Sequence, residues 1–114
     1  ADERVREALA AGRPILEAAE AWYSGAHLFE TLPCVLLILA RHGDDPEEAI
    51  VRAVNDTKDN DTVAAIVGAA VGALHGERAL PDRWLRGLLG RTGADDDGRV
   101  FALLGAAVAR FLAD

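Results

Sequence analysis

The sequence predicts an all-α fold in the form of a compact multi-helix orthogonal bundle. Apolar residues recur at three- and four-residue spacing through most of the chain, and the alternating pattern of a half-buried strand is almost absent. Prolines near the expected helix starts and glycines near the expected ends divide this pattern into segments. With 114 residues, 51% of them hydrophobic, the chain forms one domain at most and can bury a single core.

Three helices are expected in the first third of the chain. The first covers about residues 2–11, and the second covers residues 14–22. Gly25 marks the break before a third helix at about residues 28–41, which has Pro33 in its first turn. Because this third helix is apolar on most faces, we expect it to be central.

A clear acidic start signal introduces the fourth helix. Asp45 can cap it, Pro46 takes the first helical position, and Glu48 completes a capping-box-like pair. This short helix leads into a polar run, Asn55–Asp61, and a fifth helix is expected over Thr62–Leu74.

The fifth helix has an unusual face, because Ala64, Gly68, Gly72 and Gly76 recur at four-residue spacing. Each glycine inside a helix costs up to about 1 kcal/mol relative to alanine, so we expect close packing to offset it. The same spacing is found in membrane helices that dimerise, but this helix is too short to cross a bilayer.

The C-terminal part is expected to contain two further helices. Pro81 opens the first, residues 90–98 form a polar connection, and Arg99–Leu112 form the second, with apolar residues at core spacing.

Composition excludes several classes of partner. A net charge of −7 without a basic stripe argues against nucleic acid, and no apolar stretch is long enough to cross a membrane. Cys34 is the only cysteine and lies in an apolar run, so we expect a buried thiol and a reducing, cytoplasmic location. The chain lacks methionine and begins within a charged helical pattern, which predicts part of a larger protein.

The polar run before the fifth helix is the strongest candidate for a functional site. Asp59, Asp61 and Thr62 offer two carboxylates and a hydroxyl within four residues, and Mg²⁺ prefers such oxygen ligands. Asp and Thr are equally typical of an ordinary helix cap. A cap needs one such residue, whereas Asp56, Asp59 and Asp61 should repel one another unless a positive group such as Lys58 lies close. These residues alone leave both the metal site and the cap open.

Two other classes of Asp-x-Asp motif do not fit. A calcium-binding EF-hand loop needs a glycine and further oxygen ligands at fixed offsets, but here the chain turns apolar at Val63. The nucleophile motif of haloacid-dehalogenase-like phosphatases follows a hydrophobic strand, and residues 55–58 are too polar to form one.

Three segments within Glu30–Trp84, about half of the chain, carry a family resemblance. They are Ala53-Val54-Asn55, then Asp59-Asn60-Asp61-Thr62 with its Ala- and Gly-rich helix, and then Gly76-Glu77-Arg78-Ala79-Leu80-Pro81-Asp82-Arg83-Trp84. In order and spacing they resemble the C-terminal part of the ADP-ribosylglycohydrolase family, the relatives of the enzyme that reactivates dinitrogenase reductase.

This resemblance implies an all-α hydrolase with two metal ions, usually Mg²⁺ or Mn²⁺. In that family the ions lie in a cleft where a glycosidic bond of an ADP-ribosylated protein or small molecule is cleaved. By position, Asp59, Asp61 and Thr62 are the implied metal ligands. Thr57-Lys58 stand where the family commonly has Gly-Gly, and we expect Lys58 to bind substrate, for example through a phosphate.

The resemblance also implies that residues 1–114 are the C-terminal segment of a single domain. The family's other metal ligands, its catalytic glutamate and its diphosphate-binding loop lie in the N-terminal half, and residues 1–29 resemble none of them. We therefore expect this segment to supply half of a binuclear metal site, to need the missing N-terminal half as its partner, and to be inactive alone. The alternatives are a non-catalytic ADP-ribose-binding or protein-interaction module, and a purely structural helical domain.

Overall fold

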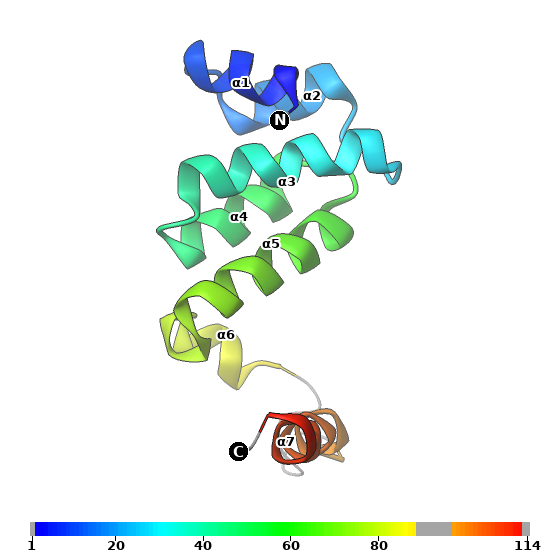
Figure 1. Ribbon diagram of the computed structural model, residues 1–114, viewed down its shortest axis with the longest axis vertical. Helices are drawn as coiled ribbons and strands as arrows, with labels where there is room; N and C mark the ends of the chain where they lie inside the picture. Colours follow the sequence, from blue (N-terminus) through cyan, green and yellow to red (C-terminus); the bar gives the residue numbers. More distant parts are fainter. Residues whose placement is uncertain (1, 89–96, 113–114) are drawn as a thin grey trace. The chain divides into compact units, whose positions relative to one another are not determined.

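The computed structural model describes residues 2–88 and 97–112, and every regular element within these ranges is helical (Figure 1). The all-α prediction is thus confirmed. The helices are α1 (Glu3–Ala10), α2 (Ile15–Trp22), α3 (Leu28–His42), α4 (Pro46–Asp56), α5 (Asn60–His75), the 3₁₀-helix η1 (Glu77–Ala79), α6 (Asp82–Arg86) and α7 (Arg99–Phe111). The chain divides into two compact units, residues 1–80 and residues 81–114.

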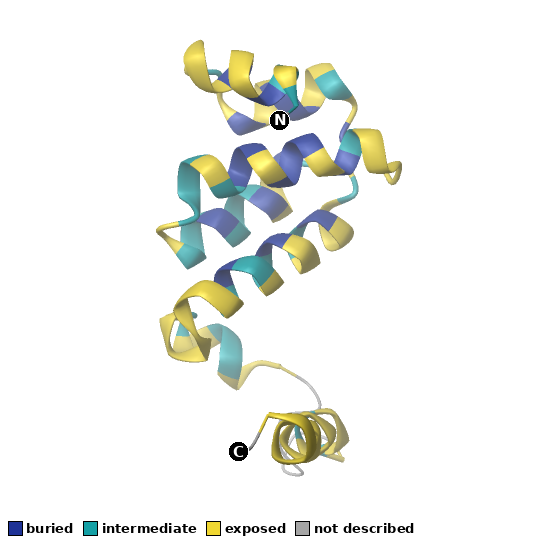
Figure 2. Cartoon of the chain, in the orientation of Figure 1, coloured by how far each residue is buried: buried dark blue, intermediate teal, exposed yellow. Residues whose placement is uncertain are grey.

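The first unit is built around α3, which contacts α1, α2, α4 and α5, so its predicted central position is confirmed. One side of each of these helices is buried, as the dark blue bands of Figure 2 show. The core consists of Val5, Ala8, Ile15, Ala18, Val35, Leu37, Ile38, Ala49, Ala53, Val63, Val67 and Val71. Four of these twelve residues are alanines, and their small side chains let neighbouring helices approach closely.

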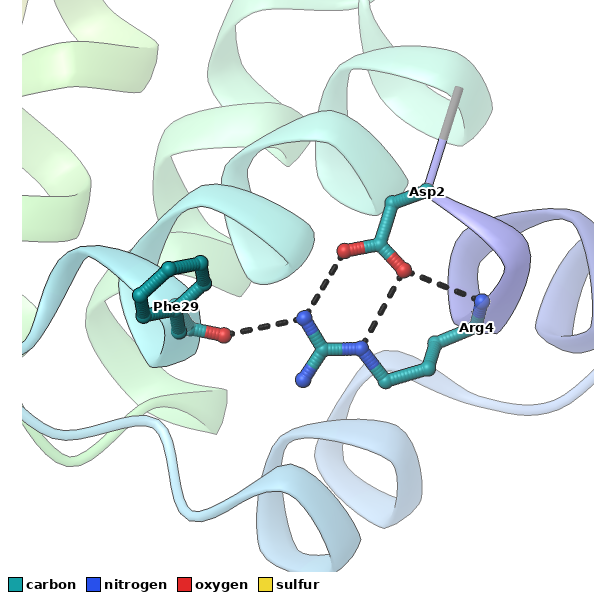
Figure 3. Close-up of polar contacts among 3 residues, drawn as sticks. All are labelled: Asp2, Arg4 and Phe29. Carbon is teal, nitrogen blue, oxygen red and sulfur yellow. Dashed lines mark hydrogen bonds and ion pairs between the residues drawn. The ribbon is translucent and has the colours of Figure 1, made fainter.

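Pro33 lies inside α3 and determines how α1 is attached to it. Because α3 begins at Leu28, Pro33 falls in the second turn and not in the predicted first turn. Proline has no backbone N–H, so the carbonyl of Phe29 lacks its helical donor. The Arg4 guanidinium of α1 donates to that carbonyl instead, with Nη2 3.0 Å from the oxygen (Figure 3).

Arg4 is itself held by Asp2, at the start of α1 (Figure 3). Its Nη2 and Nε donate to the Asp2 carboxylate at 2.8 and 3.1 Å, and the same carboxylate accepts the Arg4 backbone N–H at 3.0 Å. These contacts hold the pKa of the Asp2 carboxyl below its usual value. One arginine therefore joins the N-terminal cap of α1 to the interrupted turn of α3.

Two side-chain contacts close the neighbouring helix ends in the first unit. The Asp45 carboxylate accepts the Glu48 backbone N–H at 3.1 Å, which confirms the predicted cap of α4. At the end of α5, His75 Nε2 lies 2.6 Å from the Gly43 carbonyl oxygen just after α3. Cys34 of α3 is buried as predicted, and burial raises the pKa of its thiol to about 11.

The connection between α4 and α5 is shorter than predicted. Asn55 and Asp56 continue α4, and α5 begins at Asn60, so only residues 57–59 remain as a loop. Polar side chains of this segment bind backbone groups of α4 and so allow the helices to extend. The Thr57 hydroxyl donates to the Ala53 carbonyl at 2.6 Å, and Asn60 Nδ2 donates to the Val54 carbonyl at 3.1 Å.

The glycine face of α5 is not closely packed within the described part of the chain, contrary to the prediction. A Cβ added to Gly68 meets only Ile50 Cδ1, at 3.9 Å, and one added to Gly72 meets nothing within 4 Å. The buried face of the helix is instead formed by Val63, Val67 and Val71.

The second unit contains the predicted helix after Pro81, which is short, and α7, which covers nearly the predicted range. Of the predicted polar connection, residues 90–96 lie outside the described residues. None of the described helices combines the length and apolar character needed to cross a bilayer.

Candidate metal centre

The loop between α4 and α5 is attached to the end of α2 by backbone hydrogen bonds. The Lys58 N–H donates to Ser24 Oγ, and the Asp59 N–H donates to the Ser24 carbonyl, both at 2.9 Å. Ser24 is only 2% exposed, and its own N–H donates to the Ala19 carbonyl at 3.0 Å. These contacts join residues 34 and 35 positions apart and fix the backbone directly before Asp61 and Thr62.

Asp59 occupies the cap position of α5 but does not cap it. Its side chain makes no hydrogen bond to the first turn of the helix. One of its carboxylate oxygens, Oδ2, is buried and has no hydrogen-bond partner among the described residues. A buried acceptor without a donor is unfavourable by about 1–3 kcal/mol, and more when it is charged. The ordinary-cap interpretation therefore does not account for Asp59.

Asp61 and Thr62 lie in the first turn of α5, and both residues are exposed. Neither side chain makes a hydrogen bond or ion pair with another described residue. The two carboxylates and the hydroxyl of the predicted ligand set thus come from one helix start, and none of them is used by the fold. This donor set suits a hard divalent cation.

Asp56 does not belong to this group, contrary to the expected cluster of three repelling carboxylates. It is the last residue of α4, is 9% exposed, and forms an ion pair with Arg52 one turn earlier, at 3.1 Å. Arg52 Nε also lies 3.0 Å from Glu48 Oε1. The positive charge that the sequence required for Asp56 is therefore supplied by Arg52 within the same helix.

Lys58 does not neutralise the carboxylates either. Its ammonium nitrogen lies 4.0 Å from the centre of the Tyr23 ring, in a cation–π contact. Tyr23 is the only described residue other than glycine with a positive φ, at 55°. A left-handed tyrosine is uncommon, and such strained residues are frequent at functional sites.

Tyr23 and Lys58 line a surface pocket of about 290 Å³ between α2 and the loop before α5. The apolar part of its wall includes Leu16 and Ala19, and Glu20 stands among its polar residues. The sequence predicted Lys58 but not Tyr23 or Ser24. Gly25 signalled a chain break nearby, but no local pattern reports a hydrogen bond between segments 34 residues apart.

A second buried carboxylate oxygen belongs to Glu30, in the first turn of α3. Its Oε2 has no hydrogen-bond partner among the described residues. It lies against Gly25, where an added Cβ would be 2.5 Å from that oxygen. Thr31 beside it donates its hydroxyl to the Gly25 carbonyl at 2.9 Å. A side chain at Gly25 would therefore require the flexible end of the Glu30 side chain to shift.

Within residues 2–88 and 97–112, no group of three or more His, Cys, Asp or Glu side chains is arranged to hold a metal ion. The family to which the chain belongs follows from its similarity to known proteins. A sequence model described as ADP-ribosylglycohydrolase matches residues 1–111, nearly the whole chain. The chain belongs to the ADP-ribosylglycohydrolase family. The match extends beyond the segment that carries the motifs, Glu30–Trp84, in both directions.

A relative of this ADP-ribosylglycohydrolase family member is known only as an uncharacterised protein of Archaeoglobus fulgidus. The two are 49% identical over 49 residues, which cover 43% of this chain and 15% of the length of the relative. No solved structure matches the chain. The family assignment and the helical fold therefore agree.

Proposed function

We propose that this chain supplies Asp59, Asp61 and Thr62 to a binuclear Mg²⁺ or Mn²⁺ site in a hydrolase. The complete enzyme cleaves a glycosidic bond of an ADP-ribosylated protein or small molecule, and the other ligands come from the N-terminal half of the same fold. Family membership supports the reaction class. The observation that carries the metal assignment is Asp59, whose Oδ2 is buried and unpaired at a cap position where it makes no cap.

Each of the three residues has a distinct role in this proposal. The Asp59 and Asp61 carboxylates supply the negative charge that a divalent cation requires, and Thr62 adds a neutral oxygen. A bound divalent ion in such enzymes orients the substrate and activates an attacking water. The Ser24 carbonyl accepts the Asp59 N–H and so fixes the loop backbone at the first of these residues.

Lys58 is proposed to bind the substrate. Its contact with Tyr23 keeps the ammonium beside the pocket wall. A cation–π contact at an exposed position is worth only about 0.5–1 kcal/mol, so a phosphate oxygen can replace it through a stronger charge-assisted hydrogen bond.

Metal binding is tested by thermal melting of the 114-residue chain in Mg²⁺ or Mn²⁺. A ligand that binds only the folded state at about ten times its Kd adds about 1.4 kcal/mol, which corresponds to a few degrees in Tm. We expect this rise in the wild type and in Asp45→Ala, and its loss in Asp61→Ala. An equal rise in Asp61→Ala contradicts the assignment, and no rise in the wild type at about 10 mM metal favours a purely structural domain.

The chain alone is proposed to be inactive, because it contains only one part of the metal site. The measurement is release of ADP-ribose from an ADP-ribosylated peptide by the 114-residue chain in Mg²⁺. Substantial turnover would show that no further segment is needed.

The second candidate function is a binding module without catalysis, and the placement of Lys58 over Tyr23 favours it. In that case the pocket beside α2 takes up ADP-ribose without a metal. Calorimetric titration with ADP-ribose in EDTA separates the two functions. Binding that is unchanged by Asp61→Ala but lost in Lys58→Ala favours the module, and binding that requires metal favours the hydrolase.

A further inference from the structure

The surface pocket beside α2 lies at the C-terminal ends of two helices. α2 ends at Trp22 and α4 ends at Asp56, and residues from both ends line the pocket. A helix C-terminus carries partial negative charge, because its last carbonyl groups have no partners within the helix. Neither helix has a basic residue in its last turn, whereas α3 ends in Arg41 and His42. Both helix ends at the pocket therefore favour a positive charge from elsewhere.

The side chains of the pocket wall add to this preference for a cation. Glu20 lines the pocket, and its carboxylate makes no hydrogen bond or ion pair with another described residue. Asp56 also lines it but is already paired within α4. Tyr23 is 58% exposed, and the face of an aromatic ring is its negative side. With the apolar Leu16 and Ala19 beside them, these groups suit an ammonium group on an aliphatic chain.

An ammonium group of the protein itself already lies against the Tyr23 ring. Lys58 Nζ is 4.0 Å from the ring centre, inside the limit of about 6 Å for a cation–π contact. Lys58 forms no ion pair with another described residue. The edge of the ring lies against Gly25, where an added Cβ would be 3.2 Å from Tyr23 Cε1. Because Lys58 is exposed and its contact with the ring is weak, a second ammonium group can compete with it for the ring.

We propose that the pocket beside α2 binds an aliphatic primary ammonium group in place of Lys58. The ligand is a free amine or the lysine side chain of a polypeptide, which share this chemistry. Its nitrogen contacts the Tyr23 ring, Glu20 and the two helix ends balance its charge, and its methylene groups lie against Leu16 and Ala19. Pockets for drug-sized ligands range from about 300 to 1,000 Å³, so a volume of about 290 Å³ suits a short chain of this kind.

The ammonium pocket goes beyond the proposed function, because it needs neither the metal nor any further part of the enzyme. It does place a condition on access, since Lys58 must leave the ring before the ligand can bind. A phosphate group bound to Lys58 draws its ammonium away from Tyr23 and so opens the pocket. Binding of an anion to Lys58 and binding of an amine to Tyr23 should therefore strengthen each other by the same factor.

The test uses NMR signals that occur once in the 114-residue chain. Tyr23 is its only tyrosine and Lys58 its only lysine, so the ring signals and the ε-methylene signal need no further assignment. Titration with n-butylammonium chloride at constant ionic strength should shift the Tyr23 ring signals and move the Lys58 ε-methylene signal toward its value in the unfolded chain. 1-Butanol has the same chain length without the charge, and it should shift neither signal at the same concentration.

Substitutions test each part of the pocket through the Kd for n-butylammonium, followed on the Ser24 amide signal. Lys58→Gln removes the internal competitor and should lower the Kd about two- to fivefold, as expected for release of an exposed cation–π contact. Tyr23→Asn removes the ring, keeps a residue type that tolerates positive φ, and should raise the Kd by about the same factor. Glu20→Gln should raise it at least about twofold. Glu17→Gln is the matched control, because Glu17 is exposed on α2 outside the pocket, and should leave the Kd unchanged.

Two results would overturn the proposal. An unchanged or higher Kd in Lys58→Gln would show that the lysine does not compete for the ring. Shifts of the Tyr23 ring signals that are as large with 1-butanol as with n-butylammonium would show an apolar pocket without preference for a cation.

Two further ligands separate the source of the amine and the role of Lys58. If Nα-acetyl-lysine amide binds at least as tightly as n-butylammonium, the occupant is a polypeptide side chain, and if it binds more weakly, the occupant is a free amine. Sodium pyrophosphate should lower the Kd for n-butylammonium in the wild type but not in Lys58→Gln. If pyrophosphate has no effect while Lys58→Gln still tightens amine binding, the proposed phosphate contact of Lys58 is wrong and the ammonium pocket stands.

Discussion

The starts of α4 and α5 have the same residue type at the cap position and use it differently. Asp45 accepts the Glu48 N–H at 3.1 Å and so satisfies one of the unpaired donors of its helix. Asp59 makes no such bond, and its Oδ2 is buried without a partner. An acid that the fold uses is a structural residue, whereas an acid that the fold leaves unpaired is available to a ligand.

The backbone explains the difference. Asp45 has φ −122° and ψ 95°, the extended conformation from which a side chain can reach back to the first turn. Asp59 has φ −85° and ψ 60°, and its N–H is held by the Ser24 carbonyl. Asp59 thus combines this attachment to α2 with a backbone conformation outside the extended region that Asp45 adopts.

The largest expected effect is on the rate of ADP-ribose release, which substitutions at the start of α5 should lower and a substitution at the start of α4 should not. In the proposed complete enzyme, Asp59→Ala or Asp61→Ala should reduce metal-dependent release of ADP-ribose by at least about 100-fold, because each removes a proposed charged ligand of the metal. Asp45→Ala in the same protein should leave the rate unchanged within about twofold. Equal rates for Asp45→Ala and Asp61→Ala would remove the functional distinction between the two helices.

Asp56 extends the comparison to an acid that is buried and used. Asp56→Asn breaks the ion pair with Arg52 and should lower the free energy of unfolding by about 2 kcal/mol, as expected for a partly buried pair. Urea denaturation followed by circular dichroism measures this change. Arg52→Lys is the control, because it keeps the positive charge. If Arg52→Lys lowers the free energy of unfolding as much as Asp56→Asn does, the loss comes from packing and not from the charge.

The sequence predicts those features of the molecule that depend on residues close together in the chain, and it misses those that depend on contacts between distant segments. The helix ranges and the Asp45 cap follow from local signals, because periodicity, proline and capping residues act within a few positions. The position of Asp59, the Arg4 contact with Phe29 and the Tyr23–Lys58 pair join distant segments, and no local pattern encodes them. Asp56 was assigned to the wrong group because a run of acids does not reveal which one a neighbouring arginine binds.

Titration of the buried Cys34 thiol should change the stability of the core without changing the stability difference between the variants of the two helix starts. Burial raises the pKa of its thiol from an ordinary value near 9 to about 11, so the folded protein keeps a proton that the unfolded chain has lost. Stability is therefore full below about pH 9 and falls by roughly 1–2 kcal/mol as the pH rises toward 11. Urea denaturation at pH 8 and pH 10.5 measures this fall, and Cys34→Ala should reduce it. The difference between Asp45→Ala and Asp59→Ala should stay constant over the same range.

The smallest expected effect is the most direct comparison of the two caps. Without metal, Asp45→Ala should lower the free energy of unfolding by about 1 kcal/mol, because a helix cap is lost. Asp59→Ala should leave it unchanged or raise it slightly, because removal of an unpaired buried carboxylate relieves a desolvation cost. Urea denaturation in EDTA compares the two variants, and an equal loss in both would mean that Asp59 is a structural residue after all.

The two hydrogen bonds of Ser24 have a consequence for affinity. A flexible loop that closes around an ion must give up conformational freedom at the moment of binding, and this weakens the complex. Here Lys58 and Asp59 are already joined to Ser24, just after α2, across 34 and 35 positions of the chain. The backbone of this proposed metal-binding loop is therefore ordered during folding, and binding of the proposed cation would not have to supply that ordering.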